Sequence, residues 1–242
     1  MRQASSDFQP AMKSIPGWGK TFGQSQPANT DAFAAIGTVM RRVAKDTLFW
    51  EGDPVDHVYQ VMRGVVCLYK LLPDGRRQVA RFCHAGDVIG LTADRRYPYT
   101  ADALTELSVV RIRRADLYSR MESDRGLLQK VLSAIGQELS LAQNQLLLLG
   151  RKSAPERVAS FLHAMVDQAQ RDGGDGQSVT LPMTRVDIAD FLGLTHETVC
   201  RVLSSLKGEG IIATPDPHCI EIRLPEVLEE MAEGDAPERL CA

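Results

Sequence analysis

The sequence has few aromatic residues, no long hydrophobic run and little excess charge. Only 6% of the 242 residues are aromatic, so aliphatic side chains must fill most of the core. The leucine cluster at residues 146–149 is far too short to cross a bilayer, and the first residues contain no apolar signal core. The formal net charge of -3 argues against a histone-like protein coated in basic side chains. Sequence-specific DNA binding stays open, because it needs only a local footprint.

Cysteine is sparse, and its spacing lacks the pairs that disulfides or metals need. The five cysteines are odd in number and form no C-x-x-C pair, which disfavours a disulfide framework or a zinc ribbon. The five histidines show no metal-ligand spacing. No nucleophile–base arrangement or glycine-rich phosphate loop is recognisable, so no catalytic residues are expected. We expect a cytoplasmic protein without a metal site, a membrane partner or enzyme activity.

Short apolar runs separated by turn signals extend over about residues 39–113. Pro73-Asp74-Gly75 is typical of such a turn, and Asp-Gly between two strands is a strong hairpin signal. Closely spaced short strands indicate a β-barrel or jelly roll. The preceding residues 1–35 are rich in Ser, Gln, Pro and Gly without periodicity, which indicates a flexible arm.

The apolar spacing becomes helical after about Arg114, and one narrow seam runs along the expected helix. Its members follow one another in steps of four and three: Leu128, Leu132, Ile135, Leu139, Ala142, Leu146 and Leu149. This heptad spacing is typical of two helices that pair, and polar residues flank the seam. A homodimer is therefore expected; the alternative is a helix packed on its own barrel. We expect Gly150 to end the helix.

Residues 181–212 carry the most specific local signals. Thr184 is suited to cap a short helix, Gly193 to form a turn with positive φ, and Thr195 to cap a second helix. Small Ala189 lets the two helices approach closely. This order predicts a helix-turn-helix whose second helix enters the major groove of double-stranded DNA. Two short strands around a proline-rich turn then form a wing.

The exposed side of the second helix is the candidate DNA-reading surface. Arg201 is able to donate two hydrogen bonds to guanine O6 and N7, and Glu197 is able to accept one from cytosine N4. Their spacing of four also lets Glu197 orient Arg201, although the same spacing occurs in ordinary surface ion pairs. The predicted DNA-binding residues are His196, Glu197, Cys200, Arg201, Ser204, Thr184 and Arg185.

These signals divide the chain into five parts. We expect a flexible arm at residues 1–35, a barrel at 36–115, a dimerisation helix at 116–150, a winged helix-turn-helix at 151–228 and a tail at 229–242. The 44% hydrophobic content is enough for two modest domains.

The chain resembles the CRP/FNR superfamily of bacterial regulators over about residues 39–224. The resemblance rests on GDPVDHVYQVMRGVVCLYKLLPDGRRQVARFCHAGDVIGL, on the dimer helix and on MTRVDIADFLGLTHETVCRVLSSL. It implies an α+β fold, with an N-terminal cyclic-nucleotide-binding-like β-barrel and a C-terminal winged helix-turn-helix. The E-x-x-S-R pattern of the FNR and FixK branch matches at Glu197 and Arg201, with Cys200 in place of Ser. That pattern implies a TTGA-type palindrome, bound by a homodimer that recruits RNA polymerase.

Departures from the pattern distinguish the subtypes. No cysteine precedes Cys67, so the four-thiolate iron–sulfur cluster of FNR is not expected. Leu91 and Tyr99 stand where cAMP-binding members have the Glu and Arg that hold ribose and phosphate, so a cyclic phosphate lacks its countercharge. What remains resembles FixK. It implies no cofactor, activation of low-oxygen respiration or nitrogen metabolism genes, and control largely through the protein's own expression. The alternative is a ligand-dependent gas or redox sensor, for example with haem at His84 or Cys83.

Three further features have two interpretations each. Cys200 is a candidate redox site at the DNA surface, but a small residue replacing Ser is the favoured interpretation. Arg76, Arg77 and Arg81 form a positive cluster, which is more often a solvated hairpin than an anion site. Residues 94–98 form a loop that is a candidate contact for RNA polymerase.

Overall fold

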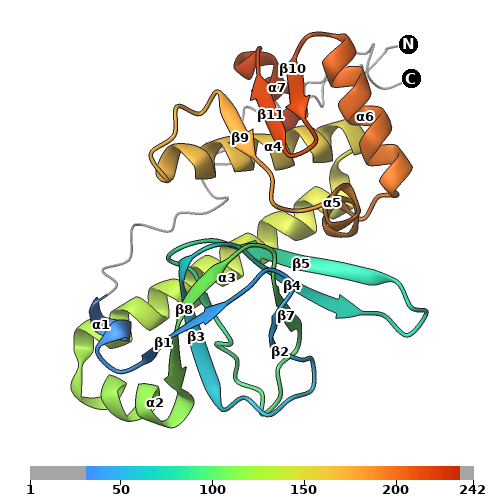
Figure 1. The fold of residues 1–242 in the computed structure, drawn as a ribbon. Helices are drawn as coiled ribbons and strands as arrows, with labels where there is room; N and C mark the ends of the chain where they lie inside the picture. The colour runs from blue at the N-terminus through green and yellow to red at the C-terminus, as the bar shows by residue number, and fades with distance from the viewer. Residues whose placement is uncertain (1–30, 235–242) are drawn as a thin grey trace, which may run out of the picture.

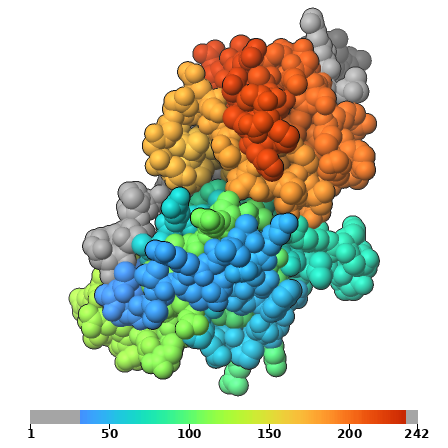
Figure 2. All heavy atoms as spheres, in the orientation of Figure 1, coloured from blue at the N-terminus to red at the C-terminus, as the bar shows by residue number. Residues whose placement is uncertain are grey.

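The computed structural model describes residues 31–234, which form two lobes joined by a long helix (Figure 1; Figure 2). The predicted arm before residue 31 and the predicted tail after residue 234 lie outside the described residues. Residues 31–34, expected as part of the arm, form the short helix α1 (Asp31–Ala34). The C-terminal helix α7 (Pro225–Glu233) extends into the predicted tail, because Leu228 and Met231 are buried in the second lobe.

The N-terminal lobe is built from two facing four-stranded antiparallel sheets, in the orders β1-β8-β3-β6 and β2-β7-β4-β5. Apolar side chains such as Val61, Val66 and Val109 point between the sheets and are fully buried. Gly75 has a φ of 86° in the predicted turn between β4 and β5. The predicted barrel is therefore present. The strands are β1 (Thr38–Arg42), β2 (Thr47–Phe49), β3 (His57–Arg63), β4 (Val66–Leu71), β5 (Arg77–Cys83), β6 (Val88–Ile89), β7 (Thr100–Ala103) and β8 (Leu107–Arg113).

The helical segment after the barrel is divided into two helices, where one was expected. Helix α2 (Arg114–Ser123) ends at Asp124, whose backbone is extended. The Asp124 side chain then accepts a hydrogen bond from Leu127 N at 3.0 Å and caps α3 (Arg125–Arg151). The expectation that Gly150 ends the helix is wrong: α3 continues through it. A glycine near a helix end costs only about 1 kcal/mol, and the chain turns at Lys152, just before Ser153 caps the next helix.

Different faces of α3 serve different neighbours. Leu127 and Val131 are buried against the barrel, and Leu148 is buried in the C-terminal lobe. Most of the predicted seam is exposed: Leu132, Leu139 and Leu146 are 57%, 59% and 73% exposed, whereas Leu149 packs partly against the second core. The exposure of these three leucines disfavours packing of the seam on its own barrel.

The C-terminal lobe packs helices and a small sheet around a second core. The sheet has the order β10-β11-β9, and β10 and β11 form the predicted wing. Ser153 and Glu156 form the predicted capping box of α4. The elements are α4 (Ala154–Arg171), β9 (Ser178–Thr180), α5 (Arg185–Leu192), α6 (His196–Gly208), β10 (Ile212–Asp216) and β11 (Cys219–Ile222), followed by α7.

Candidate nucleic-acid interface

Helix α5 is positioned by the two local signals that the sequence supplies. At its start, Thr184 Oγ1 accepts from Asp187 N at 3.1 Å and Asp187 Oδ2 accepts from Thr184 N at 2.8 Å. At its end, Gly193 adopts the left-handed conformation with a φ of 62°. Leu194 N then donates to Ala189 O, which closes the turn toward α6. The predicted helix-turn-helix geometry is therefore present.

Helix α6 buries one side and presents the other to solvent. Thr195 Oγ1 accepts from Thr198 N at 3.2 Å and caps the helix as predicted. Its apolar side packs into the second core through Val199, Val202, Leu203 and Leu206. The opposite side carries the predicted DNA-reading residues, of which Cys200 is half-buried and the others are exposed: His196, Glu197, Cys200, Arg201 and Ser204.

The expected pairing of Glu197 with Arg201 is not formed. Within residues 31–234, no ion pair joins these two side chains. Hydrogen bonds from its own backbone N–H and from Thr195 instead lower the pKa of Glu197. Glu197 lies in the first turn of α6, where negative charge is favoured. Arg201 remains available for an external acceptor.

The other predicted contacts have partners within the lobe. Arg185 donates to Pro217 O at 3.0 Å, so it joins the start of α5 to the turn of the wing. Thr184 is exposed at the α5 cap. On α6, Cys200 Sγ lies 3.5 Å from His196 Nε2, and Ser204 Oγ donates to Cys200 O at 2.8 Å.

The prediction of a solvated arginine cluster on the β4–β5 hairpin is wrong for two of its three members. Arg76 is exposed and pairs with Asp74 in its own turn. Arg77 Nη1, however, lies 2.5 Å from Asp187 Oδ1 and 3.4 Å from Asp190 Oδ2 on α5.

Gln78, the next residue, also reaches the helix-turn-helix, because its Nε2 donates to Asp190 O at 2.6 Å. Arg81 pairs with Asp87 at 2.6 Å and also with Glu138 of α3. The hairpin is thus a contact between the barrel and the C-terminal lobe. Sequence reasoning missed this contact because the partners are separated by 110 residues or more.

The barrel contains a cavity of about 400 Å³ at the position where a cyclic nucleotide was considered. Leu91 and Tyr99 line it, as do apolar residues of the barrel and of α3. Its one charged lining residue within the described chain is Glu138, a carboxylate. A cyclic phosphate would find no countercharge there, in agreement with the sequence interpretation.

The surroundings of the two barrel cysteines keep their thiols protonated and unreactive. Cys67 and Cys83 are fully buried. Burial raises the pKa of the Cys67 thiol to about 12 and that of Cys83 well above its usual value, so neither is a thiolate near neutral pH. Among residues 31–234, no group of three His, Cys, Asp or Glu side chains is placed to hold a metal ion. No helix in the same range is long and apolar enough to span a bilayer.

Comparison with known proteins identifies both lobes. A model of the Crp-like helix-turn-helix domain matches residues 156–231, and a model of the cyclic nucleotide-binding domain matches residues 40–124. The transcriptional activatory protein AadR of Rhodopseudomonas palustris is 42% identical over 195 residues, which cover 80% of this chain and 82% of AadR.

Two further relatives belong to one branch. The nitrogen fixation regulation protein FixK of Azorhizobium caulinodans is 43% identical over 194 residues, covering 78% of this chain and 77% of FixK. The solved structure of FixK2 from Bradyrhizobium japonicum superposes with a TM-score of 0.76 at 37% identity, covering 81% of this chain and 97% of that chain.

Proposed function

The chain belongs to the CRP/FNR family, in its FixK-like branch, and is a DNA-binding transcriptional activator. We propose that it binds a TTGA-type palindrome as a homodimer. The proposed targets are genes of low-oxygen respiration or nitrogen metabolism, and the proposed mode of action is recruitment of RNA polymerase in the cytoplasm. The relatives named for nitrogen fixation regulation support the choice of genes.

The observation that carries the proposal is the free Arg201 on the exposed side of α6. Its guanidinium has no partner among residues 31–234 and lies one turn after Glu197, which is in the first turn of α6. A helix docked by its N-terminal turns in the major groove would present both groups to base edges. Guanine and cytosine offer the matching acceptors and donor.

The exposed seam of α3 supports the homodimer. Leucines at heptad spacing that are more than half exposed are unfavourable in water, and a second α3 would cover them. An isologous pair of helices places the two copies of α6 around a two-fold axis. A two-fold protein matches a palindromic site.

The loop proposed to contact RNA polymerase is smaller than expected. Tyr97 is buried, and its ring stacks on Phe49 with centroids 3.8 Å apart. Asp94, Arg95 and Arg96 remain exposed at the tip. A contact with polymerase would therefore be made through these three side chains.

Fluorescence anisotropy on a labelled TTGA palindrome tests the DNA-binding proposal. Arg201→Ala should cost about 1–3 kcal/mol of binding free energy and relax discrimination at one base pair. Arg125→Ala is the matched control, because Arg125 is an exposed arginine on α3, away from α6. If Arg201→Ala bound each DNA sequence with the same affinity as the parent protein does, the base-contact role of Arg201 would be refuted.

A further inference from the structure

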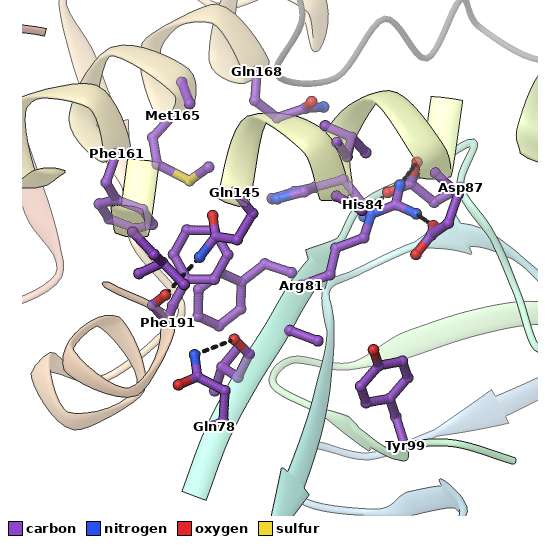
Figure 3. Close-up of a pocket in the computed structure, with 18 of the residues that line it drawn as sticks. Gln78, Arg81, His84, Asp87, Tyr99, Gln145, Phe161, Met165, Gln168 and Phe191 are labelled. Atoms are coloured by element: carbon purple, nitrogen blue, oxygen red, sulfur yellow. Dashed lines mark hydrogen bonds and ion pairs between the residues drawn. The ribbon is translucent and has the colours of Figure 1, made fainter. Parts of the chain in front are cut away.

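The two ends of helix α5 are held by different parts of the molecule. At its end, Gln145 of α3 donates a hydrogen bond to Phe191 O at 2.7 Å (Figure 3). At its start, Arg77 of the barrel strand β5 places its Nη1 2.5 Å from Asp187 Oδ1. Because these two anchors come from different elements, Arg77 is placed to set the position of the first turn of α5 relative to the barrel.

The packing between α5 and the barrel is incomplete. A cavity of about 350 Å³ lies where α5 meets strand β5, and Phe82 and Phe191 are among the residues that line it (Figure 3). Atoms that border empty space lose dispersion contacts, so polar contacts take a larger share in holding α5 on the barrel. Two such contacts come from β5: Gln78 Nε2 donates to Asp190 O at 2.6 Å, and Arg77 pairs with Asp187.

Arg77 is itself fixed on the barrel by two residues of β4, the strand paired with β5. Its guanidinium lies over the ring of Tyr69, 4.2 Å from the ring centroid, and its Nη2 donates to Cys67 Sγ at 3.3 Å. A planar guanidinium that stacks on a ring and donates to a buried sulfur has little freedom to rotate. The barrel therefore presents this positive charge to α5 at a defined place.

A single carboxylate connects Arg77 to the first turn of α5. Asp187 Oδ1 faces Arg77, whereas Asp187 Oδ2 accepts from Thr184 N at 2.8 Å and from Thr184 Oγ1 at 2.7 Å. The Asp187 side chain is only 11% exposed, and Asp190 follows it at a spacing of three on the same helix. Without Arg77, burial and the like charge of Asp190 would both disfavour the Asp187 carboxylate. Loss of Arg77 would therefore loosen the cap of α5.

The first turn of α5 lies beside the exposed side of α6. Arg185 donates to Pro217 O in the wing at 3.0 Å. Burial lowers the pKa of Arg185, and Cys200 of α6 is near enough to oppose this shift. In a helix-turn-helix the first helix crosses the phosphate backbone, and arginine side chains are common phosphate donors. Arg185 and the exposed Thr184 are thus placed to contact a phosphate when α6 lies in the major groove.

We propose that Arg77, a residue of the barrel, is a positioning residue for DNA binding: through Asp187 it holds the start of α5 where Arg185 reaches a DNA phosphate. Arg77 acts through the helix and is not itself a DNA contact. This role rests on the proposed binding of DNA by α6 and extends it to a residue of the other lobe. The barrel would thus contribute to DNA affinity through a side chain that is fixed in place.

The salt dependence of DNA binding tests this role, because each phosphate contact contributes about 0.9 to the slope of log K against log salt concentration. A dimer that loses one phosphate contact in each half-site should lose about 1.8 of this slope. Arg77→Gln should therefore bind the labelled palindrome roughly tenfold more weakly at low salt, with a slope that is smaller by about 1.8. Arg76→Gln is the matched control, because it removes the same charge from an exposed arginine that pairs with Asp74 in its own turn. Its slope should equal that of the parent.

Three further variants separate positioning from a general loss of stability. Arg77→Lys keeps a positive charge beside Asp187 and should restore part of the lost slope. Arg185→Ala removes the proposed phosphate contact, so that adding Arg77→Gln to it should change the slope little further. Val61→Ala destabilises the barrel core, far from α5 in the fold, and should leave the slope unchanged. Circular dichroism under the assay conditions confirms that each variant is folded.

Three results would overturn the positioning role. They are an unchanged slope in Arg77→Gln, fully additive effects of Arg77→Gln and Arg185→Ala, and tighter DNA binding by Arg77→Gln, which would make the contact a brake on DNA binding. Failure of the parent to prefer the palindrome would count against the proposed function instead. The same slopes measured on a duplex of unrelated sequence would then decide the role of Arg77, because non-specific binding also depends on phosphate contacts.

Discussion

The contact between Arg77 and helix α5 permits a quantitative prediction for Arg77→Gln. The guanidinium lies between Asp187 and Asp190, and the side chains of Arg77 and Asp187 are only 25% and 11% exposed. Loss of one partner costs about 3–5 kcal/mol for a buried pair and at most about 1 kcal/mol for an exposed pair. This pair is between these limits, so the free energy of unfolding should fall by about 2 kcal/mol.

The loss should depend on pH in a definite direction. Burial alone would raise the pKa of Asp187, but hydrogen bonds from Arg77 and Thr184 hold it below its usual range. A carboxyl group with a lowered pKa stabilises the fold fully above its unfolded pKa of about 3.9, and this contribution is lost as pH falls through the folded pKa. The difference between the parent and Arg77→Gln should therefore be full at pH 7 and shrink below about pH 4.

Urea unfolding followed by circular dichroism measures this difference, and anisotropy on the palindrome measures its effect on DNA binding. Arg76→Gln is the control, because Arg76 is exposed and pairs only within its own turn; it should change stability by less than about 0.5 kcal/mol. Equal stability of Arg77→Gln and Arg76→Gln would refute the reasoning.

Three other substitutions have defined outcomes. Leu139→Glu places a charge in the exposed seam and should shift the protein from dimer to monomer in sedimentation velocity runs; an unchanged dimer would exclude the seam as the interface. Cys200→Ser should retain DNA binding and remove any loss of binding after peroxide treatment, and a persistent loss would eliminate Cys200 as the redox site. Burial lowers the pKa of Lys152 to about 8, so the parent should gain stability between pH 8 and the unfolded pKa of about 10.4, where only the unfolded chain binds this proton. Lys152→Met should lack that gain in urea unfolding at several pH values.

The sequence predicts well those features that depend on neighbours in the chain. The Thr184 and Thr195 caps, the Gly193 turn and the Gly75 hairpin each arise from backbone preferences and hydrogen bonds over a few residues. The buried side of α6 follows from helical periodicity in the same way. These local signals were enough to identify the helix-turn-helix and the barrel.

Features that depend on packing between distant segments could not be predicted. Arg77 and Arg81 lie in a hairpin whose charged composition is typical of solvent-exposed turns. Only in the folded chain do carboxylates of α5 and α3 lie beside them. The break between α2 and α3 at Asp124 depends on how α2 packs on the barrel. The spacing of apolar residues along the sequence does not predict this packing. Glu197 and Arg201 have ion-pair spacing, but the helix N-terminus also favours the carboxylate and lowers the pKa of Glu197.

Helix α3 connects the three tasks that a regulator of this architecture must coordinate. It packs on the barrel through Leu127, enters the DNA-binding core through Leu148, and carries the exposed seam of the proposed dimer. Gln145 joins it directly to the end of α5 through Phe191 O. Because a continuous helix transmits displacement along its length, a shift at the seam near Leu146 must also move the anchor of the helix-turn-helix. In the proposed dimer, the spacing of the two recognition helices would thus be set by the same residues that join the two copies.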